Sequence, residues 1–98
     1  MNNIIDRITK MENILDELTI VVEKSDNVMN ELEDSLKNLN ILKAYYESQY
    51  MIDVMADKRQ EVPQDLKRGV LSEDAVHMLL TDLLELSKKM EKLSKKIR

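Results

Sequence analysis

A single apolar stripe with a seven-residue period runs through the first fifty residues and limits what this part of the chain can form. With Ile4 placed at heptad position d, twelve of the fourteen a and d positions up to Tyr50 hold an apolar or aromatic side chain. This periodicity predicts one long helix over residues 4–48, with Asn3 as its N-cap. Several g positions widen the stripe to three residues per heptad, which is typical of a helix that packs against two neighbours in a bundle. These g positions are Ile14, Val21, Val28 and Leu42.

The weakest part of this predicted helix is the run from Lys24 to Asn27, because its residue types favour caps and turns over helix interiors. We favour a continuous helix, since the run contains neither glycine nor proline and the heptad phase is the same before and after it. The alternative is a turn at residues 25–27, which would give a self-contained bundle of three or four helices.

The heptad phase is then lost, so the chain is expected to kink and restart as a short helix over residues 49–58, capped by Ser48. Residues 59–72 contain the only proline and the only glycine of the chain and are expected to form a loop. In this loop Pro63 suits the first position of a single helical turn, and Gly69 suits the left-handed position after that turn.

The clearest helix start in the chain is Ser72, an N-cap followed by two acidic residues, with Leu71 and Val76 spaced to form a hydrophobic staple. It begins a predicted helix over residues 73–97 with an apolar stripe of its own. Because turn residues are scarce elsewhere, the sequence predicts an all-α fold in a single domain, residues 1–98. We expect a long N-terminal heptad helix, a short connecting helix and an antiparallel C-terminal helix, forming a hairpin or bundle completed by dimerisation.

Composition indicates the cellular compartment that suits the protein. The chain has no cysteine, which excludes disulfides and thiolate chemistry and fits a reducing, cytoplasmic compartment. No apolar run is long enough to cross a bilayer, so we expect no membrane span. The N-terminus does not have the pattern of a signal peptide.

The predicted helix lengths point to self-association. The last helix covers little more than half of the first, which leaves residues 4–22 without an intrachain partner. A second copy of the chain is the simplest cover for their apolar side chains, so we expect a homodimer. The predicted self-association residues are Ile4, Ile8, Met11, Leu15, Leu18 and Val22.

Residue types that support catalysis or metal binding occur only in weak patterns. Asp74 and His77 form one acid-x-x-His pair, and Asp82 and Glu85 form one carboxylate pair, but neither has the further inward ligands that a metal site needs. The single glycine excludes a glycine-rich phosphate loop. We therefore predict no enzyme activity, catalytic residue, cofactor, metal or small-molecule substrate. The alternative is a helical-bundle enzyme or metal-binding protein with carboxylate ligands.

Charge is distributed unevenly along this chain, whose net charge is −4. Residues 12–36 are strongly acidic and residues 88–98 are basic. An antiparallel last helix would bring the two segments together, so charge pairing within the chain would explain the basic end. Nucleic acid is disfavoured as a partner because the whole protein is acidic, and a nucleic-acid-associated regulator ranks third among the functions considered.

Polar side chains around the loop form a predicted partner-contact surface. Asp65, Lys67, Arg68 and Glu73 lie near the glycine, and packing does not account for them. We predict that they contact another protein; the alternative is that they only pair with one another and cap the loop. The function predicted from the sequence is thus a non-enzymatic, self-associating module for protein interaction.

The same loop carries a specific motif. Residues 65–74 read Asp-Leu-Lys-Arg-Gly-Val-Leu-Ser-Glu-Asp and follow the adjacent pair Tyr45 and Tyr46. With these residues the chain resembles a family of short helical bacterial proteins, mostly from low-GC Gram-positive species, known only as a domain of unknown function. The resemblance implies a bacterial, cytoplasmic origin, and it supplies no activity and no site residues.

Overall fold

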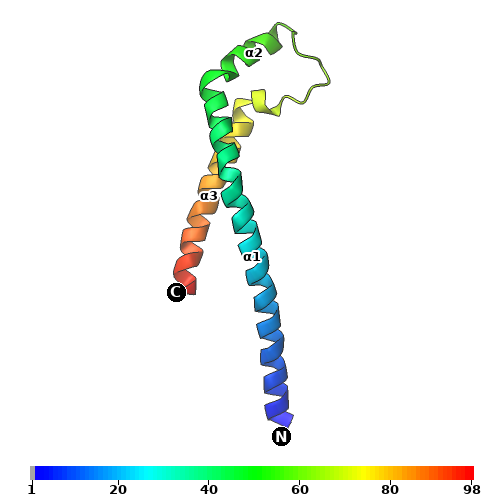
Figure 1. Ribbon diagram of the computed structural model, residues 1–98, viewed down its shortest axis with the longest axis vertical. Helices are drawn as coiled ribbons and strands as arrows, with labels where there is room; N and C mark the ends of the chain where they lie inside the picture. Colours follow the sequence, from blue (N-terminus) through cyan, green and yellow to red (C-terminus); the bar gives the residue numbers. More distant parts are fainter. Residues whose placement is uncertain (1) are drawn as a thin grey trace. The chain divides into compact units, whose positions relative to one another are not determined.

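The computed structural model describes residues 2–98, and within them every regular element is helical (Figure 1). Helix α1 spans Asn2–Ser48, α2 spans Tyr50–Lys58, the 3₁₀ turn η1 spans Gly69–Leu71, and α3 spans Glu73–Ile97. The all-α prediction is confirmed, with a long N-terminal helix followed by shorter ones. None of these helices combines the length and the apolar character that crossing a membrane requires.

The chain divides into two compact units, one ending at Ala44 and the other formed by Tyr45–Arg98. In the first unit, α1 runs without interruption through residues 24–27, as the unchanged heptad phase predicts. The turn-favouring side chains of this run are exposed to solvent and leave the helix backbone intact. The expected N-cap at Asn3 is wrong, because α1 begins at Asn2 and an N-cap needs a non-helical backbone.

The junction between α1 and α2 is a kink in a nearly continuous helix. The Gln49 N–H donates to the Tyr45 carbonyl over 2.9 Å, and the Asp53 N–H donates to the Gln49 carbonyl over 3.1 Å. The i to i−4 pattern of an α-helix therefore persists on both sides of Gln49, whose φ and ψ of −98° and −21° are helical. The expected N-cap at Ser48 is wrong, because Ser48 is itself the last residue of α1. The continuing helical hydrogen bonds also leave few backbone N–H groups that a cap would have to pair.

Helix α2 ends at Lys58, and the residue after its C-cap Arg59 is Gln60, which has a left-handed backbone with a φ of 61°. The Gln60 N–H donates to the Asp57 carbonyl over 2.9 Å, and the Glu61 N–H donates to the Ala56 carbonyl over 3.1 Å. These two bonds define a Schellman motif. Gly69, for which the sequence predicted the left-handed conformation, has no positive φ and begins η1 instead. That expectation is wrong, because the chain turns directly after α2 and uses no second left-handed residue in the loop.

The start of α3 follows the sequence closely. Ser72 has an extended backbone (φ −85°, ψ 118°), and its Oγ accepts a hydrogen bond from the Ala75 N–H over 3.4 Å, which confirms it as the N-cap. Glu73 and Asp74 occupy the first turn, where carboxylates suit the positive end of the helix dipole. Val76 follows at 7% exposure and is the one buried residue within residues 2–98. The turn η1 contacts both α2 and α3, so it joins the elements of the second unit.

Candidate functional site

The first unit presents a continuous apolar surface along α1, the segment in which the sequence predicted self-association. We call it the α1 strip, and each of its members is between 50% and 65% exposed. Every described residue up to Asn30 is exposed. Single exposed apolar side chains are ordinary, whereas a continuous row of them marks an interaction site. The α1 strip consists of Ile4, Ile8, Met11, Leu15, Leu18 and Val22.

The second unit contains an aromatic cluster where α1 passes into α2. Tyr46 and Tyr50 stack with ring centroids 4.2 Å apart and an interplanar angle of 20°. Tyr45 meets Tyr50 edge to face, at 6.5 Å and 87°. All three rings are half-buried, and aromatic pairs in these geometries add about 0.5–1.5 kcal/mol each beyond the burial of their area. We call these residues the tyrosine cluster; it packs across the kink.

The three tyrosine hydroxyls have different surroundings. The Tyr45 hydroxyl donates to Asp53 Oδ2 over 2.8 Å, and this bond to a carboxylate raises the pKa of Tyr45. The Tyr50 hydroxyl donates to the Leu71 carbonyl over 3.1 Å, which ties the kink to η1. The Tyr46 hydroxyl is shielded from solvent and has no hydrogen-bond partner of good geometry within residues 2–98. Desolvation raises the pKa of Tyr46 to about 12, and the nearby Tyr50 hydroxyl and α3 carboxylates add to the shift.

Arg68 holds the loop against α2. Its Nη2 donates to the Pro63 carbonyl over 2.6 Å and its Nη1 to the Gln64 carbonyl over 3.4 Å. Its Nε lies 3.3 Å from Asp57 Oδ1, with both side chains about one-third exposed. The Leu66 N–H also donates to the Pro63 carbonyl, over 3.2 Å, so the predicted helical turn is a single hydrogen-bonded turn. Sequence reasoning missed Asp57 as a partner, because no local pattern links residues eleven positions apart.

The predicted partner-contact residues fall into two groups. Arg68 is engaged with α2 and the loop backbone, whereas Asp65, Lys67 and Glu73 are exposed. Within the part of the chain that the structure describes, no ion pair or side-chain hydrogen bond joins these four residues to one another. The three exposed side chains therefore remain available to a partner.

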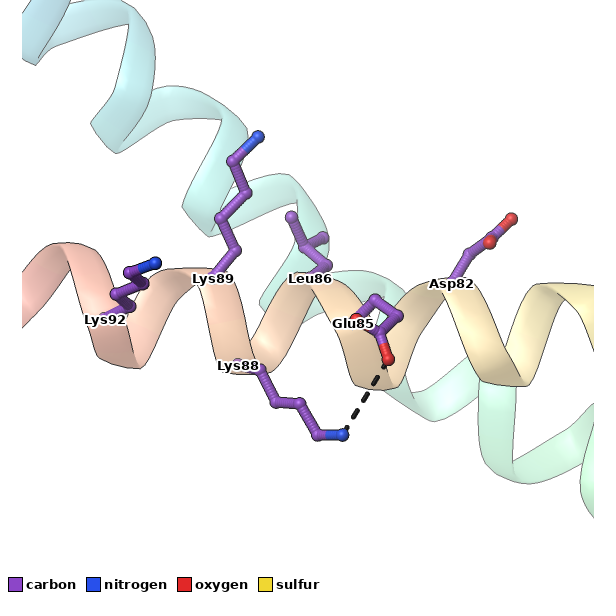
Figure 2. A pocket seen from close by; sticks show the side chains of 6 residues that line it. All are labelled: Asp82, Glu85, Leu86, Lys88, Lys89 and Lys92. Atoms are coloured by element: carbon purple, nitrogen blue, oxygen red, sulfur yellow. Dashed lines mark ion pairs between the residues drawn. The ribbon is translucent and has the colours of Figure 1, made fainter.

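Helix α3 carries an open hollow lined by side chains of both charges (Figure 2). Figure 2 shows Lys88 extending toward Glu85, with 3.7 Å between Nζ and Oε1. Further along the helix, Lys95 Nζ lies 4.0 Å from Glu91 Oε1. These i,i+3 and i,i+4 pairs place part of the basic charge beside acids of the same helix. The lining residues are Asp82, Glu85, Leu86, Lys88, Lys89 and Lys92.

The acid-x-x-His pair lies near the start of α3. His77 is exposed, as is Asp74 one turn before it. Within residues 2–98, no group of three or more histidine, cysteine, aspartate or glutamate side chains is arranged to hold a metal ion. The pair thus has no third protein ligand among the described residues.

Comparison with known proteins supplies a family for this arrangement of helices. The model of the domain of unknown function DUF4298 matches residues 8–93, which is most of the chain. The chain belongs to the DUF4298 family. Membership confirms the resemblance to a family known as a domain of unknown function. No curated protein and no solved structure matches the chain.

Proposed function

We propose that this chain is a non-enzymatic module that self-associates through the α1 strip and binds another protein through its second unit. The observation that carries the proposal is the exposure of the α1 strip, whose six members are each at least half exposed. The whole chain lacks cysteine, which supports a reducing, cytoplasmic compartment for the protein.

The energetics of the α1 strip suit a moderate dimer. Full burial of one large aliphatic side chain contributes about 1.5–3 kcal/mol, so two half-exposed strips offer on the order of 10 kcal/mol. Association loses about 4–15 kcal/mol of translational and rotational freedom. A dimer that forms at tens of micromolar needs a surplus of about 6 kcal/mol, which remains when the cost is at the low end of this range. We therefore expect a concentration-dependent dimer rather than an obligate one.

The experiment is a mass measurement by light scattering after size exclusion. At tens of micromolar the chain should give about twice its mass of 11.5 kDa. Leu15→Glu should shift the mass toward that of the monomer, because it would bury an unpaired charge in the interface. Ile20→Glu is the matched control: Ile20 is also about half exposed (51%) but lies at an f position, outside the stripe. A monomeric wild-type chain would contradict the proposal.

The second unit offers Asp65, Lys67 and Glu73 as its contact surface. Affinity capture from the native host, read by mass spectrometry, should recover a partner that Lys67→Glu loses while the thermal midpoint is unchanged. Lys37→Glu is the charge-matched control, since Lys37 is an exposed lysine of the other unit. If Lys67→Glu lowers the midpoint and keeps the partner, the loop surface is structural. Arg68 is left unchanged because it holds the loop.

A further inference from the structure

The exposed stripe of α1 has two unlike flanks. On one side of the a and d residues, the g positions Ile14, Val21 and Val28 are apolar and 40%, 56% and 61% exposed. On the other side, the e positions Glu12 and Asp26 are acidic and exposed, and they alternate with Ile5 and Thr19. This asymmetry decides how a second copy of α1 can lie against the first, because the e and g residues flank the seam of any helix pair.

A parallel dimer would mix the two flanks. In a parallel pair, each g residue lies beside the e residue of the following heptad in the second copy. Val21 would then lie beside Asp26 and Val28 beside Glu33, so carboxylates would lie against apolar side chains. The one favourable pair would be Arg7 with Glu12.

An antiparallel dimer separates the two flanks. In an antiparallel pair, g residues lie beside g residues and e residues beside e residues. Ile14 of one copy then meets Val21 of the other, which extends the apolar contact on one side of the seam. The e positions Ile5, Glu12, Thr19 and Asp26 lie along the other side, where the two carboxylates remain open to water.

The acidic flank also selects the register. When Leu15 lies opposite Leu18 of the second copy, Glu12 faces Thr19 and Asp26 faces Ile5, so no acid faces an acid. One carboxylate of each copy then lies beside an apolar side chain, against two in the parallel pair. A shift of one heptad in one direction places Glu12 opposite Asp26. A shift in the other direction places Glu12 opposite Glu12 of the second copy. Like charges directly opposed are destabilising, so the first register is preferred.

We propose that two copies of the chain pair through α1 in antiparallel orientation, with Leu15 opposite Leu18 of the second copy and residues 4–29 overlapping. The inference rests on the proposed self-association and specifies its geometry. The overlap covers the whole α1 strip over about 39 Å, at 1.5 Å per residue. It also opposes the two helix dipoles, which is the favourable arrangement for neighbouring helices.

The charges along the overlap agree with this orientation. The segment with Asp6, Arg7 and Lys10 carries one net positive charge, and the segment with Glu23, Lys24 and Asp26 carries one net negative charge. The antiparallel register places these two segments at the same height along the seam, at both ends of the dimer. A parallel pair would place each segment beside its own copy.

The test uses single cysteines, which are unambiguous because the natural chain has none. Ile8→Cys and Ser25→Cys fall opposite each other in the proposed register. Mixed in equal amounts and oxidised, the two variants should form a disulfide-linked heterodimer, with one variant carrying a tag so that masses distinguish the products. Each variant alone should cross-link poorly. Ile20→Cys at the outer f position is the control and should not cross-link with either.

The outcomes separate this inference from the proposed function. A monomeric mass for the wild-type chain contradicts self-association itself. A dimeric mass with efficient cross-linking of Ile8→Cys alone means a parallel pair and overturns the antiparallel inference only. A dimeric mass with no enrichment of the mixed product overturns the register. If either variant fails to dimerise when reduced, Ile14→Cys with Val21→Cys tests the same register on the apolar flank.

Discussion

At the scale of single residues, the tyrosine cluster holds two stacked rings whose hydroxyls differ in their hydrogen bonding. Tyr46 and Tyr50 share one aromatic contact, with centroids 4.2 Å apart. The Tyr50 hydroxyl gains the Leu71 carbonyl as its acceptor. The Tyr46 hydroxyl is shielded from water and lies close to the Tyr50 hydroxyl, but within residues 2–98 it makes no hydrogen bond of good geometry, so folding leaves it poorly satisfied.

This difference predicts opposite effects of removing the two hydroxyls. Tyr50→Phe should lower the free energy of unfolding by about 0.5–1.5 kcal/mol, because it deletes a hydrogen bond that joins the kink to η1. Tyr46→Phe should be neutral or stabilising, because it keeps the stacked ring and removes an unsatisfied polar group. Urea unfolding followed by circular dichroism measures both, and each variant serves as the other's control. Destabilisation by Tyr46→Phe would mean that its hydroxyl has a partner.

The tyrosines also predict how stability depends on pH. The pKa of Tyr46 is raised to about 12 in the folded chain, against 10.0 for an ordinary tyrosine, and the pKa of Tyr45 is raised as well. The unfolded chain therefore releases these protons first, and stability is lost as pH rises from about 10 to about 12. The thermal midpoint should fall over this window, and the fall should be smaller in Tyr46→Phe. If the thermal midpoint falls equally with pH in the wild-type chain and in Tyr46→Phe, Tyr46 does not cause the loss of stability.

At the scale of helices and turns, the caps divide into those that the sequence specifies and those that it does not. Ser72 is followed by acids and an apolar run, and it caps α3 as this pattern predicts. Ser48 belongs to the same residue type but lies in a helical hydrogen-bond ladder that hardly breaks, so no cap is needed there. A serine therefore predicts an N-cap only where backbone N–H groups at a helix start are left without acceptors.

The cap of α3 can be tested by itself. Ser72→Ala should lower the free energy of unfolding by about 1 kcal/mol, because the Ala75 N–H loses its acceptor at the helix start. Ser72→Asp should retain most of the stability, since aspartate caps equally well and suits the helix dipole. Thermal unfolding of the two variants beside the wild-type chain gives the comparison. An unchanged midpoint for Ser72→Ala would mean that the bond, 3.4 Å long, contributes nothing.

Much of the fold could be predicted from the sequence. Helix identities and most helix ends follow from periodicity, and the continuity of α1 follows from its unbroken phase. The left-handed Gln60 could not be predicted, because glutamine gives no turn signal and the Schellman bonds form only once α2 has ended. The links from Tyr50 to Leu71 and from Arg68 to Asp57 depend on how the second unit packs, which local patterns do not encode.

At the scale of the whole molecule, α1 is a long helix whose described side chains are mostly open to solvent. It contains 47 residues, none of which is buried, and its first thirty described positions lie open to solvent on every side. Helices in water gain most of their stability from packing of an apolar face rather than from intrinsic propensity. The helicity of α1 should therefore depend on what covers the α1 strip.

This dependence predicts that helix content changes with protein concentration. If the second copy covers the α1 strip, dilution from tens of micromolar to well below one micromolar should reduce the circular dichroism at 222 nm, because the monomer frays from its N-terminal end. Leu15→Glu should show the low value at every concentration, and Ile20→Glu should follow the wild-type curve, since Ile20 lies outside the strip. The thermal midpoint should rise with concentration for the wild-type chain and the control alone. Helix content that stays constant on dilution, with Leu15→Glu matching the wild type, would mean that α1 is stable uncovered and that the α1 strip does not mediate self-association.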